Sequence, residues 1–141
     1  MKKQKFEELK TSLLEQGYKV YDQHWKHEDY VICKGFHKED NKWDEDRCAY
    51  QILLSVYDYS DTTKDYYNQL PQHARNKVDI EITIMVSRTI DERIDMYMAW
   101  HEDTTIEEVE AQAEEFYKWV NFVWFEPREE ENKCEQSTTC R

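Results

Sequence analysis

One cluster of side chains holds the residue types that could bind zinc. His24, His27, Cys33 and His37 form the spacing H-x2-H-x5-C-x3-H, and imidazole nitrogens and a thiolate are ligands that zinc prefers. The segment also has strand-like character, and successive side chains of a strand point to opposite faces. The spacing therefore does not bring all four groups around one ion. Solvated histidines on edge strands are the simpler interpretation.

Two other polar segments could carry chemistry. The acidic segment 38–47 (KEDNKWDEDR) suggests calcium, but it lacks the glycine at position six and the glutamate at position twelve of an EF-hand loop. His101, Glu102 and Asp103 could supply an acid and a base. Adjacent side chains seldom face one another, however, and the simpler role of Asp103 is helix capping. We expect a hydrated loop at the first segment and a helix start at the second.

Motifs for nucleotide or acyl-transfer chemistry are missing. The sequence has no G-x-S-x-G, no G-x-G-x-x-G and no P-loop, and Gly17 and Gly35 are its only glycines, so a phosphate-cradling loop cannot be built. We therefore predict no catalytic residue, no metal site and no cofactor, and a non-enzymatic role is favoured.

Composition limits the partner classes. A chain of 141 residues with a net charge of -12 fits one domain and argues against binding to nucleic-acid phosphates or to an anionic membrane. No apolar run approaches the ~20 residues that span a bilayer, and no signal-peptide pattern is present, so a cytoplasmic protein is expected. Whether Cys134 and Cys140 pair stays open.

Hydrophobic periodicity predicts the first half of the domain. Phe6, Leu9 and Leu13 have helical spacing before Gly17, which predicts a helix over 3–16 with a glycine cap. The runs YKVYDQHW and DYVICKGF predict a hairpin, and CAYQILLSVYDY predicts a third strand. A short helix, capped by Ser60 or Asp61, is expected to end near Pro71.

The second half predicts two more strands and a long helix. VDIEITIMV and RIDMYMAW alternate apolar and polar residues and should pair antiparallel across a short linker. Thr104 or Thr105 should cap the last helix. We expect an α+β domain over 1–126, with a five-stranded antiparallel sheet and both the N-terminal and C-terminal helices on one face. The polar segment 127–141 should be a disordered tail.

The last helix carries more aromatic rings than one sheet can cover. Five aromatic residues fall within 117–125 (YKWVNFVWF). A helical wheel places Trp119 at the edge of the core-facing arc and turns Phe122 and Phe125 away from it. Three explanations stay open: the helix ends near Asn121 and the rings pack internally, they form a homodimer contact, or they line a groove for a peptide. The core-facing arc contains Ile106, Val109, Ala113, Phe116, Tyr117, Val120, Val123 and Trp124.

Carboxylates line another side of the same helix. A solvated acidic face is the ordinary interpretation, and a mimic of nucleic-acid charge, which would inhibit a DNA-binding protein, is an alternative. The row consists of Glu107, Glu108, Glu110, Glu114 and Glu115.

The expected order of elements over 3–125 resembles the type III secretion chaperone-like class of domains. These domains also run helix, three strands, short helix, two strands and long helix, and "LLEQG" is reminiscent of their first segment. The leucine- and glycine-rich character of that segment is otherwise missing here. The resemblance implies a dimeric protein-binding module.

The sequence thus favours a protein-binding module, chaperone- or adaptor-like, with another protein as partner. Trp119, Phe122 and Phe125 would be apolar anchors, and Glu108 and Glu115 would favour a basic partner. The module is also expected to be a homodimer. A rival function is a small-ligand binder or enzyme on the polar face of the sheet, lined by Glu81, Met85 and Tyr97.

Overall fold

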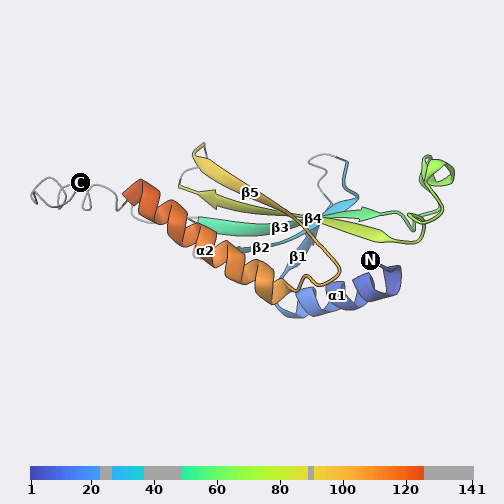
Figure 1. Ribbon diagram of the computed structural model, residues 1–141, viewed down its shortest axis with the longest axis horizontal. Helices are drawn as coiled ribbons and strands as arrows, with labels where there is room; N and C mark the ends of the chain where they lie inside the picture. Colours follow the sequence, from blue (N-terminus) through green and yellow to red (C-terminus); the bar gives the residue numbers. More distant parts are fainter. Residues whose placement is uncertain (23–26, 37–48, 89–90, 126–141) are drawn as a thin grey trace, which may run out of the picture.

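Five strands form one antiparallel sheet in chain order, with two helices on one side of it (Figure 1). The computed structural model describes residues 1–22, 27–36, 49–88 and 91–125. The elements are α1 (Lys3–Glu15), β1 (Lys19–Tyr21), β2 (Tyr30–Phe36), β3 (Ala49–Asp58), the 3-10 helix η1 (Tyr67–Gln69), β4 (Val78–Ser87), β5 (Arg93–Ala99) and α2 (Ile106–Phe125).

The register of the sheet gathers apolar side chains on one face. Ile32 pairs with Leu54, Leu54 with Ile82, and Ile82 with Met98, so one apolar row crosses β2 to β5. A slip of one residue would turn this row to the other face, because side chains alternate along a strand. The apolar pattern of β3 and β4 thereby fixes the pairing.

The two helices cover this apolar face. Phe6 and Leu13 of α1 and Val109, Ala113 and Val120 of α2 are fully buried in the same core as the strand residues. Figure 1 shows both helices on the same side of the sheet, with the start of α1 and the end of α2 at opposite ends of the molecule. The predicted α+β class and its one-sided arrangement are confirmed.

Local hydrogen bonds end α1 and begin α2 as the sequence predicts. After α1, the Tyr18 N–H donates to the Leu13 carbonyl at 3.0 Å and Gly17 N–H donates to Leu14 at 3.2 Å, with Gly17 at φ 96°. This is the Schellman arrangement, which favours glycine. At α2, Thr105 Oγ1 accepts the Glu108 backbone N–H at 3.3 Å, as an N-cap does.

Two local predictions need correction. The short helix expected between β3 and β4 is the 3-10 helix η1, which ends at Gln69, near Pro71, but neither Ser60 nor Asp61 caps it. The Asp61 carboxylate instead accepts hydrogen bonds from the Thr63 N–H and hydroxyl, at 2.9 and 2.6 Å, because a short acidic side chain closes its own turn readily. The long helix also continues to Phe125, so the prediction that it ends near Asn121 is wrong.

Neither α1 nor α2, the α-helices of the described part of the chain, is long and apolar enough to cross a membrane. Segments 38–47 and 127–141 lie outside the described residues.

The cap at Gly17 gives a test of the fold. Gly17→Ala should lower the free energy of unfolding by about 1 kcal/mol, because a Cβ is strained in the left-handed region. Gly35→Ala is the matched control, since its added Cβ would meet Gln51 atoms at 3.7 Å, an ordinary contact, without positive φ. Urea unfolding of both variants measures the difference. Equal stabilities would contradict the cap.

Candidate functional site

Apolar side chains remain exposed on the outer side of α2 near its end. Trp119 is 54% exposed, Phe122 42% and Val123 39%. Their spacing of three and four residues places them on one helix face, and we call these three residues the α2 aromatic surface. Phe116 stacks on Trp119 with 6.1 Å between ring centroids and 18° between planes. The stack holds one face of the Trp119 ring in place, which reduces the entropy lost when a partner covers it.

Phe125 does not belong to this surface. Its ring is partly buried against the core, and the Arg88 guanidinium carbon lies 5.3 Å from its centroid. The prediction that Phe125 points away from the core is therefore wrong. The reason is that Arg88, just beyond β4, reaches the flank of the last turn, which a helical wheel cannot represent. Val123, predicted to face the core, is exposed instead.

The acidic row of α2 divides into two groups. The Tyr18 hydroxyl donates to Glu110 at 2.8 Å, and the Tyr50 hydroxyl donates to Glu114 at 2.9 Å. Glu108 and Glu115 stay exposed, and the Glu115 carboxylate lies 4.0 Å from the Lys118 ammonium on the next turn. Two carboxylates thus serve contacts within the domain. The five do not form one even exterior row, as a nucleic-acid mimic would need.

The two tyrosines act as amphipathic links between the core and α2. Burial raises the pKa of the Tyr18 and Tyr50 hydroxyls, and the hydrogen bonds to Glu110 and Glu114 raise it further. Both hydroxyls therefore stay protonated and remain donors across the physiological pH range. These links fix the rotation of α2 about its axis, and with it the direction of Trp119 and Phe122.

The opposite face of the sheet holds a hollow of about 250 Å³. Glu81, Met85 and Tyr97 line it, as the rival function requires, together with Arg93 and Asp95. The Tyr57 hydroxyl donates to Glu81 at 3.2 Å, and burial followed by the Glu81 charge raises the Tyr57 pKa to about 12. We call this the sheet-face hollow.

Asp95 gives the sheet-face hollow a polar group with unused capacity. Arg93 Nε lies 3.6 Å from Asp95 Oδ2, whereas Asp95 Oδ1 is buried and has no hydrogen-bond donor in the described part of the chain. Glu28, Val31 and Leu53 of the same lining are also buried. Part of this face of the sheet is therefore buried, whereas the sequence pattern predicted a face exposed to solvent.

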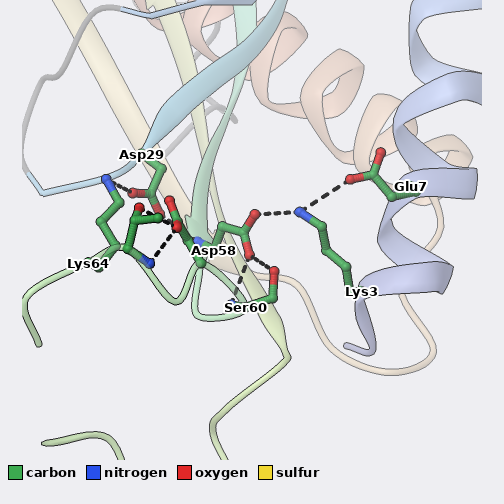
Figure 2. Close-up of polar contacts among 8 residues, drawn as sticks. Lys3, Glu7, Asp29, Asp58, Ser60 and Lys64 are labelled. Atoms are coloured by element: carbon green, nitrogen blue, oxygen red, sulfur yellow. Dashed lines mark hydrogen bonds and ion pairs between the residues drawn. The ribbon is translucent and has the colours of Figure 1, made fainter. Parts of the chain in front are cut away.

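A polar cluster joins α1 to the ends of β2 and β3 (Figure 2). The Lys3 ammonium lies between Asp58 and Glu7, pairing with Asp58 and with Glu7 at 3.2 Å, and Lys64 pairs with Asp29 at 3.0 Å. Asp29 also accepts the Asp58 backbone N–H at 2.6 Å. Each of these three carboxylates is paired with a lysine of the same cluster, so we assign this cluster a structural role.

The contribution of Asp58 to the stability of the fold depends on pH. Burial alone would raise its pKa, but the hydrogen bonds from Lys3 and Ser60 outweigh burial, and the pKa lies below the ordinary 3.8. The folded state therefore holds a proton on Asp58 less tightly than the unfolded chain does. The contribution to stability is present above about pH 4 and is lost as the pH falls through the folded-state pKa.

The candidate metal ligands considered from the sequence lie only partly within the described residues. His24 and His37 lie outside the described residues, His27 is exposed, and Cys33 is half-buried, with burial raising the pKa of its thiol. Cys48, Cys134 and Cys140 also lie outside them. Among the residues that can be described, no three His, Cys, Asp or Glu side chains are grouped to hold a metal ion.

Sequence reasoning missed a second hollow, of about 400 Å³, where α1 begins. Lys2, Lys5, Lys77, Trp100 and His101 line it, and we call it the lysine-lined hollow. The lysines in MKKQK were the available signal. Their proximity to Lys77 depends on the isolated β-bridge between Lys2 and Lys77, which no local pattern reveals.

The Asp58 cluster gives a prediction about acid stability. Asp58→Asn should lower the free energy of unfolding at pH 7 by about 1 to 2 kcal/mol, because it weakens a partly exposed ion pair and its hydrogen bonds. Near pH 3 the difference from the wild-type chain should shrink. Urea unfolding at both pH values measures this, with the exposed Asp22→Asn as control. A difference that stays constant with pH would refute the assignment.

No protein family, curated protein sequence or solved structure matches this chain. The candidate sites are therefore judged by their own geometry and chemistry.

Proposed function

We propose that this chain is a non-enzymatic protein-binding module, and that the α2 aromatic surface docks a basic protein partner. The observation that carries the proposal is the exposure of Trp119 and Phe122 on one face of α2, three residues apart. Tryptophan and other aromatic residues are common anchors at protein interfaces. Covering the exposed parts of the two rings would remove roughly 200 Å² of apolar surface from water, about 5 kcal/mol before the costs of association.

Charge favours a basic partner over a second copy of the chain. Glu108 and Glu115 are exposed on the same helix, and the whole chain carries -12. Two such chains repel one another, whereas a basic partner is attracted over about one Debye length, ~8 Å at physiological salt. The glutamates would guide the approach and the aromatic rings would hold the complex.

The order of the elements is a second reason to propose protein binding. It resembles that of type III secretion chaperone-like domains, which makes a chaperone- or adaptor-like role in the cytoplasm the form of the proposal. A fold hosts many functions, so the likeness adds to the exposed rings and does not replace them.

A synthetic amphipathic helix of leucine and lysine residues tests the proposal. It should bind the wild-type chain, more weakly at high salt, and the double variant Trp119→Ser/Phe122→Ser should weaken binding by about tenfold or more. Calorimetric titration measures both effects. Tyr97→Ser is the matched control, because it removes an exposed ring from the opposite face of the molecule and should leave the affinity unchanged.

Unchanged affinity in the double variant would contradict the proposal. Light scattering over a dilution series tests the homodimer separately. If the wild-type chain forms a dimer that the double variant dissociates, the α2 aromatic surface binds a second copy, and the basic partner is the wrong occupant.

A second candidate function is the binding of a small organic cation in the sheet-face hollow. The favouring observation is that Glu81 and Asp95 lie with the Tyr97 ring around one hollow, and that Asp95 Oδ1 is buried without a donor among the described residues. A ligand N–H could satisfy that oxygen, and an aromatic face attracts cations.

Benzylamine is a suitable probe for the sheet-face hollow. Titration should shift the methyl carbon signal of Met85, one of four methionines, and Glu81→Gln should weaken the binding several-fold, because a charge-assisted contact is lost. Asp79→Asn, which removes an exposed charge from the same strand outside the hollow, should not. A Met85 signal that does not move, or that moves equally in Glu81→Gln, would rule the site out.

A further inference from the structure

Three segments distant in the sequence meet around the lysine-lined hollow. Met1 and Val78 exchange backbone hydrogen bonds at 2.8 Å in both directions, which sets Lys2 opposite Lys77 in an antiparallel bridge. Lys5 comes from the first turn of α1. The segment after β5 is held beside β4 by the hydrogen bond from Trp100 N–H to the Ile80 carbonyl, at 3.2 Å. The backbone thus positions every side of the hollow.

The lysines of this hollow form no ion pairs within the described part of the chain. None of Lys2, Lys5 and Lys77 forms an ion pair with any residue of the described ranges, although neighbouring Lys3 is paired twice. Among the lining residues that the structure describes, Glu102 is the only one with a carboxylate. Like charges opposite one another across a strand pair repel, so the hollow concentrates positive charge within a chain of net charge -12.

The start of α1 adds to the same imbalance. No side chain caps this helix and its first turn holds no acidic residue, whereas helix starts favour negative charge. A bound anion would relieve the repulsion between Lys2 and Lys77 and also complement the helix end. The repulsion between Lys2 and Lys77 and the uncapped start of α1 both favour a negatively charged ligand.

Trp100 and the size of the hollow indicate what else the ligand contains. The Trp100 ring is partly buried and packs against the core while it also lines the hollow, so an apolar or aromatic group can lie beside it. A volume of about 400 Å³ is within the range of small-molecule sites and exceeds the needs of one inorganic ion. We propose that the lysine-lined hollow binds a small phosphate monoester, with Lys2, Lys5 and Lys77 around the phosphate and an aromatic moiety against Trp100.

The lysine-lined hollow is separate from the α2 aromatic surface. It lies where α1 starts, and the end of α2 lies at the other end of the molecule (Figure 1). Repulsion from the rest of the acidic chain is screened beyond about 8 Å at physiological salt, so the nearby lysines dominate the field in the hollow.

Phenyl phosphate is the probe, and the indole N–H signals of the five tryptophans are the readout. Trp100→Phe assigns the Trp100 signal by its disappearance. Phenyl phosphate should shift this signal in a saturable way, and inorganic phosphate should compete. Lys5→Gln/Lys77→Gln should weaken the binding at least about tenfold, because two charge-assisted contacts are lost. Lys19→Gln/Lys118→Gln, with the same loss of charge at exposed sites elsewhere, should not.

Three results would overturn the proposal. The first is a Trp100 signal that does not move. The second is an equal loss of affinity in the two double lysine variants, which would show a general charge effect. The third is an equal shift of Trp100 with phenol, since binding would then need no phosphate. Because all four lysines are exposed, these variants should keep the fold, and urea unfolding verifies it.

Discussion

The burial of one face of the sheet beneath two helices is the interaction on which the rest of the structure depends. The row that joins Ile32, Leu54, Ile82 and Met98 across four strands supplies a continuous apolar surface, and Phe6 and Val109 are among the helix residues that seal it. The hydrophobic effect scales with the apolar area removed from water, so this contact sets where α1 and α2 lie. The α2 aromatic surface and the lysine-lined hollow are consequences of that placement.

Polar side chains then refine the placement of the helices. Tyr18 and Tyr50 keep their rings in the core and donate their hydroxyls to Glu110 and Glu114, while Lys3 ties α1 to Asp58 at the end of β3. Such bonds are modest in net energy but directional. They act together with the buried stripe of Val109, Ala113 and Val120 in setting the rotation of α2. With that rotation chosen, Trp119 and Phe122 face outward.

The distribution of charge is uneven over the molecule. A net charge of -12 describes the chain as a whole, yet Lys2, Lys5 and Lys77 line one hollow without a paired carboxylate among the described residues. Salt screening makes the local arrangement more important than the total at short range. The expectation that anionic partners are disfavoured rests on the net charge and concerns extended partners such as nucleic acid. It does not extend to a small anion within the hollow.

The sequence by itself determined the elements and the covered face of the sheet, because helical and strand periodicities are local properties of the chain. The alternation in VDIEITIMV predicted β4, Gly17 predicted the end of α1, and Thr104 or Thr105 predicted the start of α2, where Thr105 is the cap. The exposure of Trp119 and Phe122 also followed from helical geometry.

Only the tertiary structure decided which side chains from distant segments meet. It placed Arg88 against Phe125, paired the glutamates of α2 with Tyr18 and Tyr50, and set Lys2 beside Lys77. Such contacts depend on where whole helices and strands lie in space. That arrangement is set by the total burial of many residues from all parts of the chain. A short segment of sequence therefore cannot reveal these contacts.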